Sequence, residues 1–293
     1  MTLPNFLIIG DLKAGTSSLY NYLKPHPEIF MSPLKETRFF AFDNKNPDHI
    51  ANGPNVWPIA TWEKYLELFN EVTDEKAIGE ASPNYLSSHI AAQRIKERLP
   101  NAQLIVSLRN PADKIYSAYL MNFREGREKR PFETVFREDL KAQTWSMTSN
   151  YNYPNLKRYF DLFDKEQIKV ILFDDLKADS LATVQNLFNF LEVDQNFTPD
   201  TSKYYKGGIP KNKLVTLLFH VIKKQDHRLN SKLKKLLPQT IVNAIKKLKQ
   251  NNLQKAPDLT PQMRKEIIET YQEDILKIQD LIERDLSSWL KYE

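Results

Sequence analysis

The segment from Phe6 to Leu19 constrains the fold more than any other part of the chain, because a strand, a turn and a helix start follow one another directly. The apolar run Phe6 to Ile9 has the character of a buried strand, and Gly10 and Gly15 bracket the turn after it. Hydroxyl residues then begin a helical pattern. Unpaired N–H groups and the dipole at a helix start attract anions. The segment therefore predicts a phosphate site at the end of a core strand.

Gly10 and Gly15 have the GxxxxG spacing of the phosphate loop of nucleoside triphosphatases, which requires a lysine directly after the second glycine. In this chain the lysine instead lies inside the loop, as Lys13. The strand-like run Leu104 to Leu108 is followed by Arg109, a cation where such an enzyme places an acidic ligand for Mg²⁺. The pattern favours a phosphorylated anion that is neutralised by lysine and arginine without a metal.

Short apolar runs alternate with helical periodicity, which predicts an α/β fold with a central parallel sheet flanked by helices. The expected strands are residues 6–9, 77–80, 104–108 and 168–173. The expected helices are residues 17–23, 62–69, 90–99, 111–122, 155–163 and 180–191, and a closing helix with Thr260 as N-cap and Pro261 at its first position. Residues 43–58 and 203–210 are expected to be surface loops.

The loop Lys13-Ala-Gly-Thr-Ser-Ser-Leu19 resembles the 5′-phosphosulfate loop of sulfotransferases that use 3′-phosphoadenosine 5′-phosphosulfate (PAPS) as sulfuryl donor. This resemblance implies a P-loop-type sulfotransferase architecture over residues 1–293, a single domain with a basic helical insertion at about 212–256. It also implies a set of cofactor-binding residues around the loop: Lys13, Ala14, Gly15, Thr16, Ser17 and Ser18.

Two further segments resemble parts of the same family that bind the donor. In Leu108-Arg-Asn-Pro-Ala-Asp-Lys-Ile-Tyr-Ser117 the guanidinium of Arg109 suits phosphate, and the resemblance implies that Arg109 and Ser117 hold the 3′-phosphate. The segment Tyr204 to Lys211 is similar to the loop that closes over the adenosine. There the resemblance implies donor contacts from Tyr205, Gly207, Gly208 and Lys211.

The candidate catalytic base is Glu36, because an acceptor hydroxyl must lose a proton as it attacks sulfur and a carboxylate accepts one. Glycan-type members of the family carry a similar Lys-Glu-x-x-Phe-Phe element, whose glutamate is the proposed base. Arg38 stands where these relatives often have histidine. Glu80 follows as a carboxylate that supports the site from behind, a possible substrate contact or a second candidate base. An ion-pair role for Glu36 is the alternative, with His49 and His89 as weaker base candidates.

Composition limits the remaining possibilities. The chain has no cysteine, which excludes disulfides, thiol nucleophiles and thiolate metal sites. It shows neither a signal-peptide pattern nor an apolar run of membrane-spanning length, so we expect a cytoplasmic protein. Residues 203–255 hold 13 Lys and one Arg against one acid. This basic segment predicts a solvated face, an anionic membrane surface contact or a cover for an acidic glycan, and its lack of interleaved aromatic residues disfavours nucleic acid.

Together these features predict a PAPS-dependent sulfotransferase whose acceptor is a glycan or another carbohydrate-containing molecule, sulfated on a hydroxyl or amine. Lys13 would bridge the leaving phosphate and the transferred group, Glu36 would take the proton, and no metal is required. A small-molecule kinase with a phosphate loop is the second hypothesis. A protein of PAPS-binding fold that binds membranes or polyanions without catalysis is the third.

Overall fold

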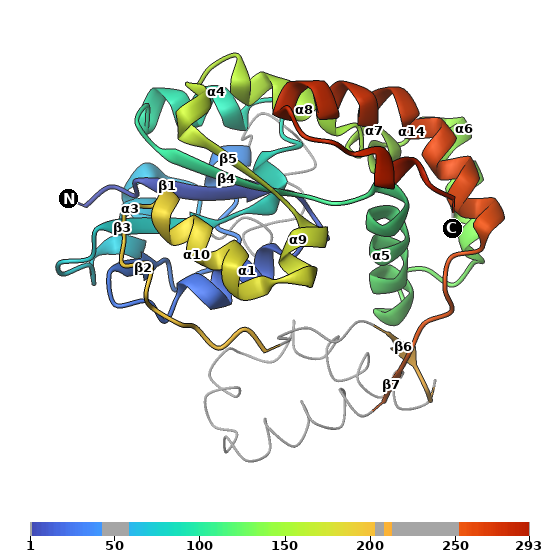
Figure 1. Cartoon of the computed structure of the whole chain (residues 1–293), viewed down its shortest axis with the longest axis horizontal. Helices are drawn as coiled ribbons and strands as arrows, with labels where there is room; N and C mark the ends of the chain where they lie inside the picture. The colour runs from blue at the N-terminus through green and yellow to red at the C-terminus, as the bar shows by residue number, and fades with distance from the viewer. Residues whose placement is uncertain (1, 43–58, 203–207, 213–251, 293) are drawn as a thin grey trace.

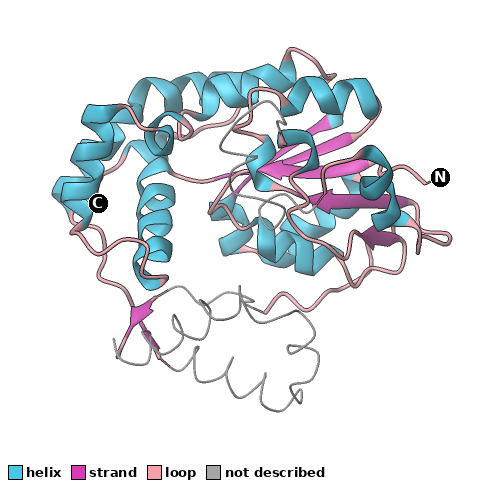
Figure 2. Cartoon of the chain, turned by 180° about the vertical axis from the view of Figure 1, so that it is seen from behind, coloured by secondary structure: helices cyan, strands magenta, loops and turns pink. Residues whose placement is uncertain are grey.

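The computed structural model describes residues 2–42, 59–202, 208–212 and 252–292. Five parallel strands form one sheet in the order β2-β3-β1-β4-β5, and Figure 2 shows them as a single layer between helices. Their bounds are β1 Phe6–Gly10, β2 Ile29–Met31, β3 Ala77–Ala81, β4 Gln103–Leu108 and β5 Ile168–Leu172. A second, antiparallel pair joins β6 (Ile209–Pro210) to β7 (Leu253–Gln254). The helices are α1 Thr16–Leu23, α3 Trp62–Leu66, α4 Ala91–Arg98, α5 Pro111–Arg124, α6 Phe132–Ala142, α7 Trp145–Thr148, α8 Asn152–Phe160, α9 Phe173–Ala178, α10 Ser180–Phe190 and α14 Pro261–Ile282.

Alternation along β1 divides the core into two layers, because successive side chains of a strand point to opposite faces of the sheet. Phe6 and Ile8 pack with the buried side chains of α1 and α10. Leu7 and Ile9 pack on the other face with those of α4, α8 and α14. Figure 1 shows these two helical layers on opposite sides of the strands. Both faces of the sheet are therefore covered, which explains why its strands read as continuous apolar runs.

The expected α/β class and its parallel sheet are confirmed, with corrections to individual elements. Strand β2 was not predicted, because three residues are too few to show a pattern. Phe173 is wrong as a strand residue, since it starts α9 and the strand ends at Leu172. Helix α8 begins at Asn152, before the expected start, because Pro154 lies in its first turn, where no intrahelical hydrogen bond is lost.

The start of the closing helix is confirmed in detail. The Thr260 hydroxyl accepts a hydrogen bond from the N–H of Met263, and Pro261 occupies the first helical position. The loop expected at 203–210 is wrong at its end, where residues 209–210 pair with 253–254. Because residues 253–254 form strand β7, the last residues of the helical insertion expected at about 212–256 are not helical. The loop at 43–58 and residues 213–251 of the insertion lie outside the described residues.

The parallel sheet brings distant parts of the sequence to one edge. The carboxyl ends of β1, β3, β4 and β5 lie side by side, so the segments that follow these strands meet there. In open parallel sheets this edge is where ligands bind. The fold therefore places the segments after Gly10, Ala81, Leu108 and Leu172 around a common space.

Candidate active site

The turn after β1 depends on a backbone conformation that favours glycine. Gly15 has φ +88°, in the left-handed region, and caps the start of α1. A Cβ atom there would lie 2.9 Å from side-chain atoms of Leu176 and Phe173. Since L-residues with a side chain rarely adopt this φ and the space is filled, both conformation and packing require glycine. The glycine allows the loop to turn sharply into the helix.

The helix start presents free donors. The N–H groups of Ser18 and Leu19 both bond to the carbonyl of Gly15, whereas those of Gly15, Thr16 and Ser17 have no partner within the described ranges. Such N–H groups, with the helix dipole behind them, form an anion site. Ala14 does not share in this. It is fully buried, its N–H bonds to the Asp11 carbonyl and its own carbonyl accepts from the Ser107 hydroxyl, so Ala14 adds no free N–H group to the anion site.

A cavity of about 1060 Å³ lies over this helix start. Sites for single small molecules are typically about 300 to 1,000 Å³, so this cavity is large enough for a ligand of nucleotide size. The predicted residues on its wall are Lys13, Gly15, Thr16, Ser17, Ser18, Glu36, Arg38, Arg109, Ser117 and Gly208. Candidates from four separate segments of the sequence thus share one cavity.

Arg109 leaves the end of β4 and reaches the loop. Its guanidinium donates to the carbonyl of Lys13 at 3.0 Å and lies 4.5 Å from the ring centre of Phe173. Its Nε is buried and has no hydrogen-bond partner among the described residues. Since buried polar atoms are almost always bonded, this donor is a place where a bound anion fits. Ser117, on the cavity-facing side of α5, lies on the same wall.

Lys13 has an unusual backbone conformation and a lowered side-chain pKa. Its backbone has φ +65°, and its ammonium contacts the sulfur of Met121 at 3.6 Å instead of a carboxylate. Burial, followed by the charges of Arg124 and Arg109, lowers the pKa of Lys13 to about 8. A cation crowded by other cations gains from an anionic ligand, because the ligand removes their repulsion.

Glu36 faces the cavity between two cations. Its carboxylate pairs with Lys35 at 2.9 Å and with Arg38 at 2.9 Å. Although burial raises the pKa of Glu36, these neighbouring charges hold it below its ordinary value. The carboxylate is therefore ionised at neutral pH, the state that accepts a proton. The ion pairs that the structure shows are therefore compatible with the predicted role of Glu36 as a base.

Three predicted site residues, Lys13, Glu36 and Arg38, have strained backbone conformations. Six residues other than glycine have positive φ in the described ranges, and three of them follow or close helices: Gln143, Glu192 and Glu283. The other three are Lys13, Glu36 and Arg38. Strained conformations persist where function or surrounding structure requires them. Their coincidence with residues predicted from sequence alone is independent support for this site.

Glu80 occupies the supporting position that was one of the alternatives predicted for it. It is fully buried, does not line the cavity, and accepts hydrogen bonds from Tyr85 at 2.6 Å, Ser82 at 2.8 Å and Thr37 at 3.2 Å. The Ser82 hydroxyl in turn accepts from the N–H of Arg38 at 3.0 Å. The interpretation of Glu80 as a substrate contact is therefore corrected. Its contacts fix the turn that carries Glu36 and Arg38.

The burial of Glu80 has a measurable consequence for stability. Burial raises its pKa from 4.5 to about 7, against the opposing effect of the hydroxyl donors. The folded protein thus keeps this proton at pH values where the unfolded chain has lost it, so stability falls as pH rises through that window. Relative to Glu80→Gln, the free energy of unfolding of the wild type is expected to fall by about 3 kcal/mol across it.

Urea unfolding at several pH values measures this difference. Glu36→Gln is the matched control: because the pKa of Glu36 is lowered, its contribution changes only below the ordinary value of 4.5, so the difference between wild type and Glu36→Gln should stay constant through the window of Glu80. A wild-type minus Glu80→Gln difference that does not change with pH would contradict the assignment.

The remaining predicted donor contacts have mixed outcomes. Gly208 lines the cavity, and a Cβ atom on it would collide with the Gln254 carbonyl. Lys211 is exposed, lies off the cavity wall and bonds through its N–H to the Asn252 carbonyl. Tyr205 and Gly207 lie outside the described residues. His89 is exposed and off the wall, and His49 is not described.

Sequence reasoning missed several cations on the cavity wall: Arg124, Arg127, Lys255 and Arg264. Arg124 is the last residue of α5 and lies two helical turns after Ser117 on the same face. It could therefore have been predicted from helical spacing. Arg264 comes from α14 and pairs with Asp113 at 2.6 Å. Only the fold brings that residue to the site, since nothing local in the sequence marks it.

An anion site at the start of a helix, on the carboxyl edge of a parallel sheet and beside a carboxylate, defines a group-transfer protein of the phosphate-loop class. The chain belongs to the family of proteins with a sulfotransferase domain, and the match spans residues 3–284. The crystal structure of a sulfotransferase from Alicyclobacillus acidocaldarius is similar, with a TM-score of 0.74 and 30% identity over 99% of this chain and 100% of that one. The predicted sulfotransferase architecture is confirmed.

Curated relatives are longer proteins. Membrane-associated sulfotransferase kil1 of Dictyostelium discoideum is 36% identical over 215 residues, 71% of this chain and 42% of that protein. Bifunctional heparan sulfate N-deacetylase/N-sulfotransferase 2 of Bos taurus is 28% identical over 210 residues, 65% of this chain and 22% of that protein. The chain thus spans less than half the length of each. Within the ranges that the structure describes, no helix combines the length and apolarity that a membrane crossing needs.

Proposed function

We propose that this protein transfers the sulfuryl group of PAPS to a hydroxyl or amine of a carbohydrate-containing acceptor. The observation that carries the proposal is the meeting of Lys13, Glu36 and Arg109 on the wall of one cavity, over the start of α1. Anion binding, charge stabilisation and proton acceptance are the three tasks that such a transfer requires. Each has a residue of suitable chemistry here.

The donor would be held at both of its phosphate ends. The free N–H groups at the start of α1 and the hydroxyls of Thr16, Ser17 and Ser18 suit the 5′-phosphosulfate. Arg109, with its orphaned Nε, and Ser117 suit the 3′-phosphate. When bound, PAPS supplies a sulfuryl group that is already activated by its phosphate leaving group. The residues present fit both of its charged ends.

Lys13 and Glu36 would act on the reacting atoms. The ammonium of Lys13 would offset the negative charge that develops on the leaving phosphate during the transfer. The carboxylate of Glu36 accepts the proton that the acceptor hydroxyl or amine loses as it bonds to sulfur. Arg38 holds this carboxylate at 2.9 Å and orients it toward the cavity. The residues therefore stabilise the leaving group on one side and activate the acceptor on the other.

A carbohydrate acceptor is favoured because one of the relatives is named for heparan sulfate. One relative is named as membrane-associated, which favours a peripheral membrane contact through the basic segment, whereas the expected cytoplasmic location has no support from the relatives. Residues 213–251 of that segment lie outside the described structure. The proposals on acceptor class and location therefore rest on the names of relatives, whereas the proposed chemistry rests on the residues of the cavity.

Calorimetric titration tests the donor. We expect 3′-phosphoadenosine 5′-phosphate (PAP), the desulfated product, to bind without metal, and Arg109→Ala to weaken its binding by about 10- to 100-fold through loss of a charged hydrogen bond. Preference for ATP with Mg²⁺ would favour the kinase, although the cation at the end of β4 opposes a metal ligand there. Binding of neither nucleotide would favour the non-catalytic alternative.

The lowered pKa of Lys13 predicts how PAP binding depends on pH. Protonated Lys13 attracts the anion, and an anion raises its pKa in the complex, so proton uptake accompanies binding above a pKa of about 8. Since phosphate is fully ionised above about pH 7, Lys13 dominates in this range. We expect the Kd to rise by up to about tenfold per pH unit from pH 8 upward. Lys13→Met should remove the dependence, and a wild-type Kd that stays constant would contradict it.

A further inference from the structure

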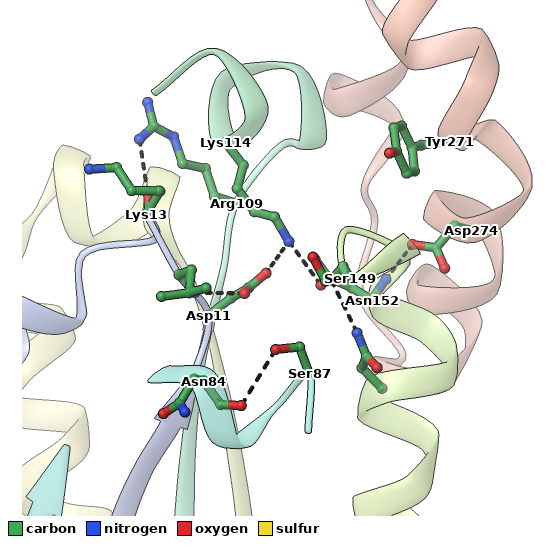
Figure 3. A network of polar contacts seen from close by, with 12 residues as sticks. Asp11, Lys13, Asn84, Ser87, Arg109, Lys114, Ser149, Asn152, Tyr271 and Asp274 are labelled. Carbon is green, nitrogen blue, oxygen red and sulfur yellow. Dashed lines mark hydrogen bonds and ion pairs between the residues drawn. The ribbon is translucent and has the colours of Figure 1, made fainter. Parts of the chain in front are cut away.

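A chain of buried polar contacts lies beneath the anion-binding loop (Figure 3). Asp11, between β1 and Lys13, and Lys114, on α5, are both 3% exposed and form an ion pair. The second oxygen of Asp11 accepts from the N–H of Leu12 at 2.6 Å. The carboxylate thus shapes the loop on one side and binds the helix on the other.

The contacts continue into the C-terminal part of the protein. Lys114 also donates to the side-chain oxygen of Asn152 at 3.1 Å. Asn152 is the first residue of α8, and its N–H and that of Tyr153 donate to the carboxylate of Asp274 on α14 at 2.9 Å each. Asp274 therefore caps α8 from a different helix. We call Asp11, Lys114, Asn152 and Asp274 the buried relay.

The Asp11–Lys114 ion pair of the buried relay connects two elements of the proposed donor site. Lys114 lies one helical turn before Ser117 on α5, and Asp11 lies two residues before Lys13 in the loop. The ion pair therefore joins the element proposed to bind the 5′-phosphosulfate to the element proposed to bind the 3′-phosphate. Apolar contacts tolerate sliding, whereas a buried ion pair is stable only when its geometry and its hydrogen bonds are satisfied. It fixes one relative placement of loop and helix.

We propose that Asp11 and Lys114 are positioning residues that set the spacing between the two phosphate sites of the donor, an inference that rests on the proposed function. PAP is a ligand with two charged ends, and its second phosphate adds affinity only when both sites are engaged at once. That gain depends on the spacing of the sites. Neither Asp11 nor Lys114 lines the cavity, so they act through the loop and α5.

The test compares PAP with adenosine 5′-monophosphate, which has only the 5′ end. The ratio of their Kd values measures the gain from the 3′-phosphate. Asp11→Asn with Lys114→Met removes both charges together, keeps an acceptor for the Leu12 N–H and fills the volume of the lysine stem, so no unpaired charge is left buried. We expect this ratio to fall at least about tenfold while the Kd for the monophosphate changes less than about threefold.

Other results overturn the inference. An unchanged ratio, including one in which both affinities fall equally, would mean that the pair supports only the fold. Tyr271→Phe is the matched control: Tyr271 lies beside Asp274 on α14 but bonds to the Met147 carbonyl at 3.1 Å, outside the relay, so its ratio should stay at the wild-type value. If the ratio of Kd values falls as far in Tyr271→Phe as in the double variant, the inference is also overturned.

The wild-type affinities distinguish a failure of the proposed function from a failure of this inference. If wild-type protein binds PAP no better than the monophosphate, the proposed donor site is wrong and the inference falls with it. If the double variant does not fold, as judged by circular dichroism, Asn152→Ala replaces it, because this change removes only the second acceptor of Lys114. The same ratio is then expected to fall about threefold, and an unchanged value overturns the inference.

Discussion

Replacing Glu36 by glutamine is expected to lower kcat by about 10²- to 10⁴-fold, the usual contribution of a general base, while PAP binds with nearly unchanged affinity. Glutamine keeps the size and the acceptor oxygen of the side chain but cannot take a proton. The carboxylate lies on the cavity wall and is kept ionised by Lys35 and Arg38, so it is the group that an acceptor would meet. Steady-state kinetics with a carbohydrate acceptor, and calorimetry with PAP, measure the two quantities.

Glu80→Gln is the matched control for that experiment, since Glu80 carries the same group but is buried off the cavity wall. Its kcat is expected to fall much less than that of Glu36→Gln, through loosening of the turn that Glu80 supports. Equal losses in the two variants, or a larger loss at Glu80, would reject Glu36 as the base. The comparison therefore separates proton acceptance from positioning.

Replacing Lys13 by methionine is expected to lower kcat by about 10²- to 10³-fold, the typical effect of removing one charge stabiliser from the reacting centre. Methionine retains most of the side-chain length, and the backbone donors at the start of α1 remain. The crowding of Lys13 by Arg124 and Arg109 means that its removal also relieves repulsion. The fold should therefore be at least as stable in the variant, which thermal unfolding measures.

Lys211→Met is the control for Lys13→Met, because Lys211 was also predicted to bind the donor but its exposed side chain lies off the cavity wall. Its kinetic constants are expected to stay within about twofold of the wild type, as for most surface substitutions. A loss at Lys211 comparable with that at Lys13 would return this lysine to the donor site. Equal and small effects at both positions would reject the role of Lys13.

The parts of the site that the sequence could predict are local ones. The loop from Gly10 to Ser18 combines a buried strand, two glycines and a helix start within one continuous segment, so its chemistry can be read without knowing the fold. Arg109 follows a strand directly, and parallel strands end at a common edge, which links it to the loop. Glu36 required a resemblance to the family, because nothing in its own neighbours distinguishes a base from an ion-pair partner.

The parts that could not be predicted depend on packing between distant segments. Glu80 looks like any acid at a strand end, and only its complete burial under Tyr85 and Thr37 shows a supporting role. Arg264 reaches the cavity because α14 crosses beside α5. These two outcomes follow from tertiary contacts, which local propensity does not contain. Helix α6, by contrast, could have been predicted, since its apolar residues Phe132, Val135, Phe136 and Leu140 have helical spacing.

The pairing of β6 with β7 has a consequence for how relatives of this protein could diverge. The pair joins residues 209–210 to residues 253–254, and the N–H of Lys211 is bonded to the Asn252 carbonyl at 2.7 Å. Gly208 on one side and Lys255 on the other belong to the cavity wall. The number of residues between the two paired segments can therefore vary among relatives at a small cost in loop-closure entropy. Insertions and deletions there would leave Gly208 and Lys255 in place.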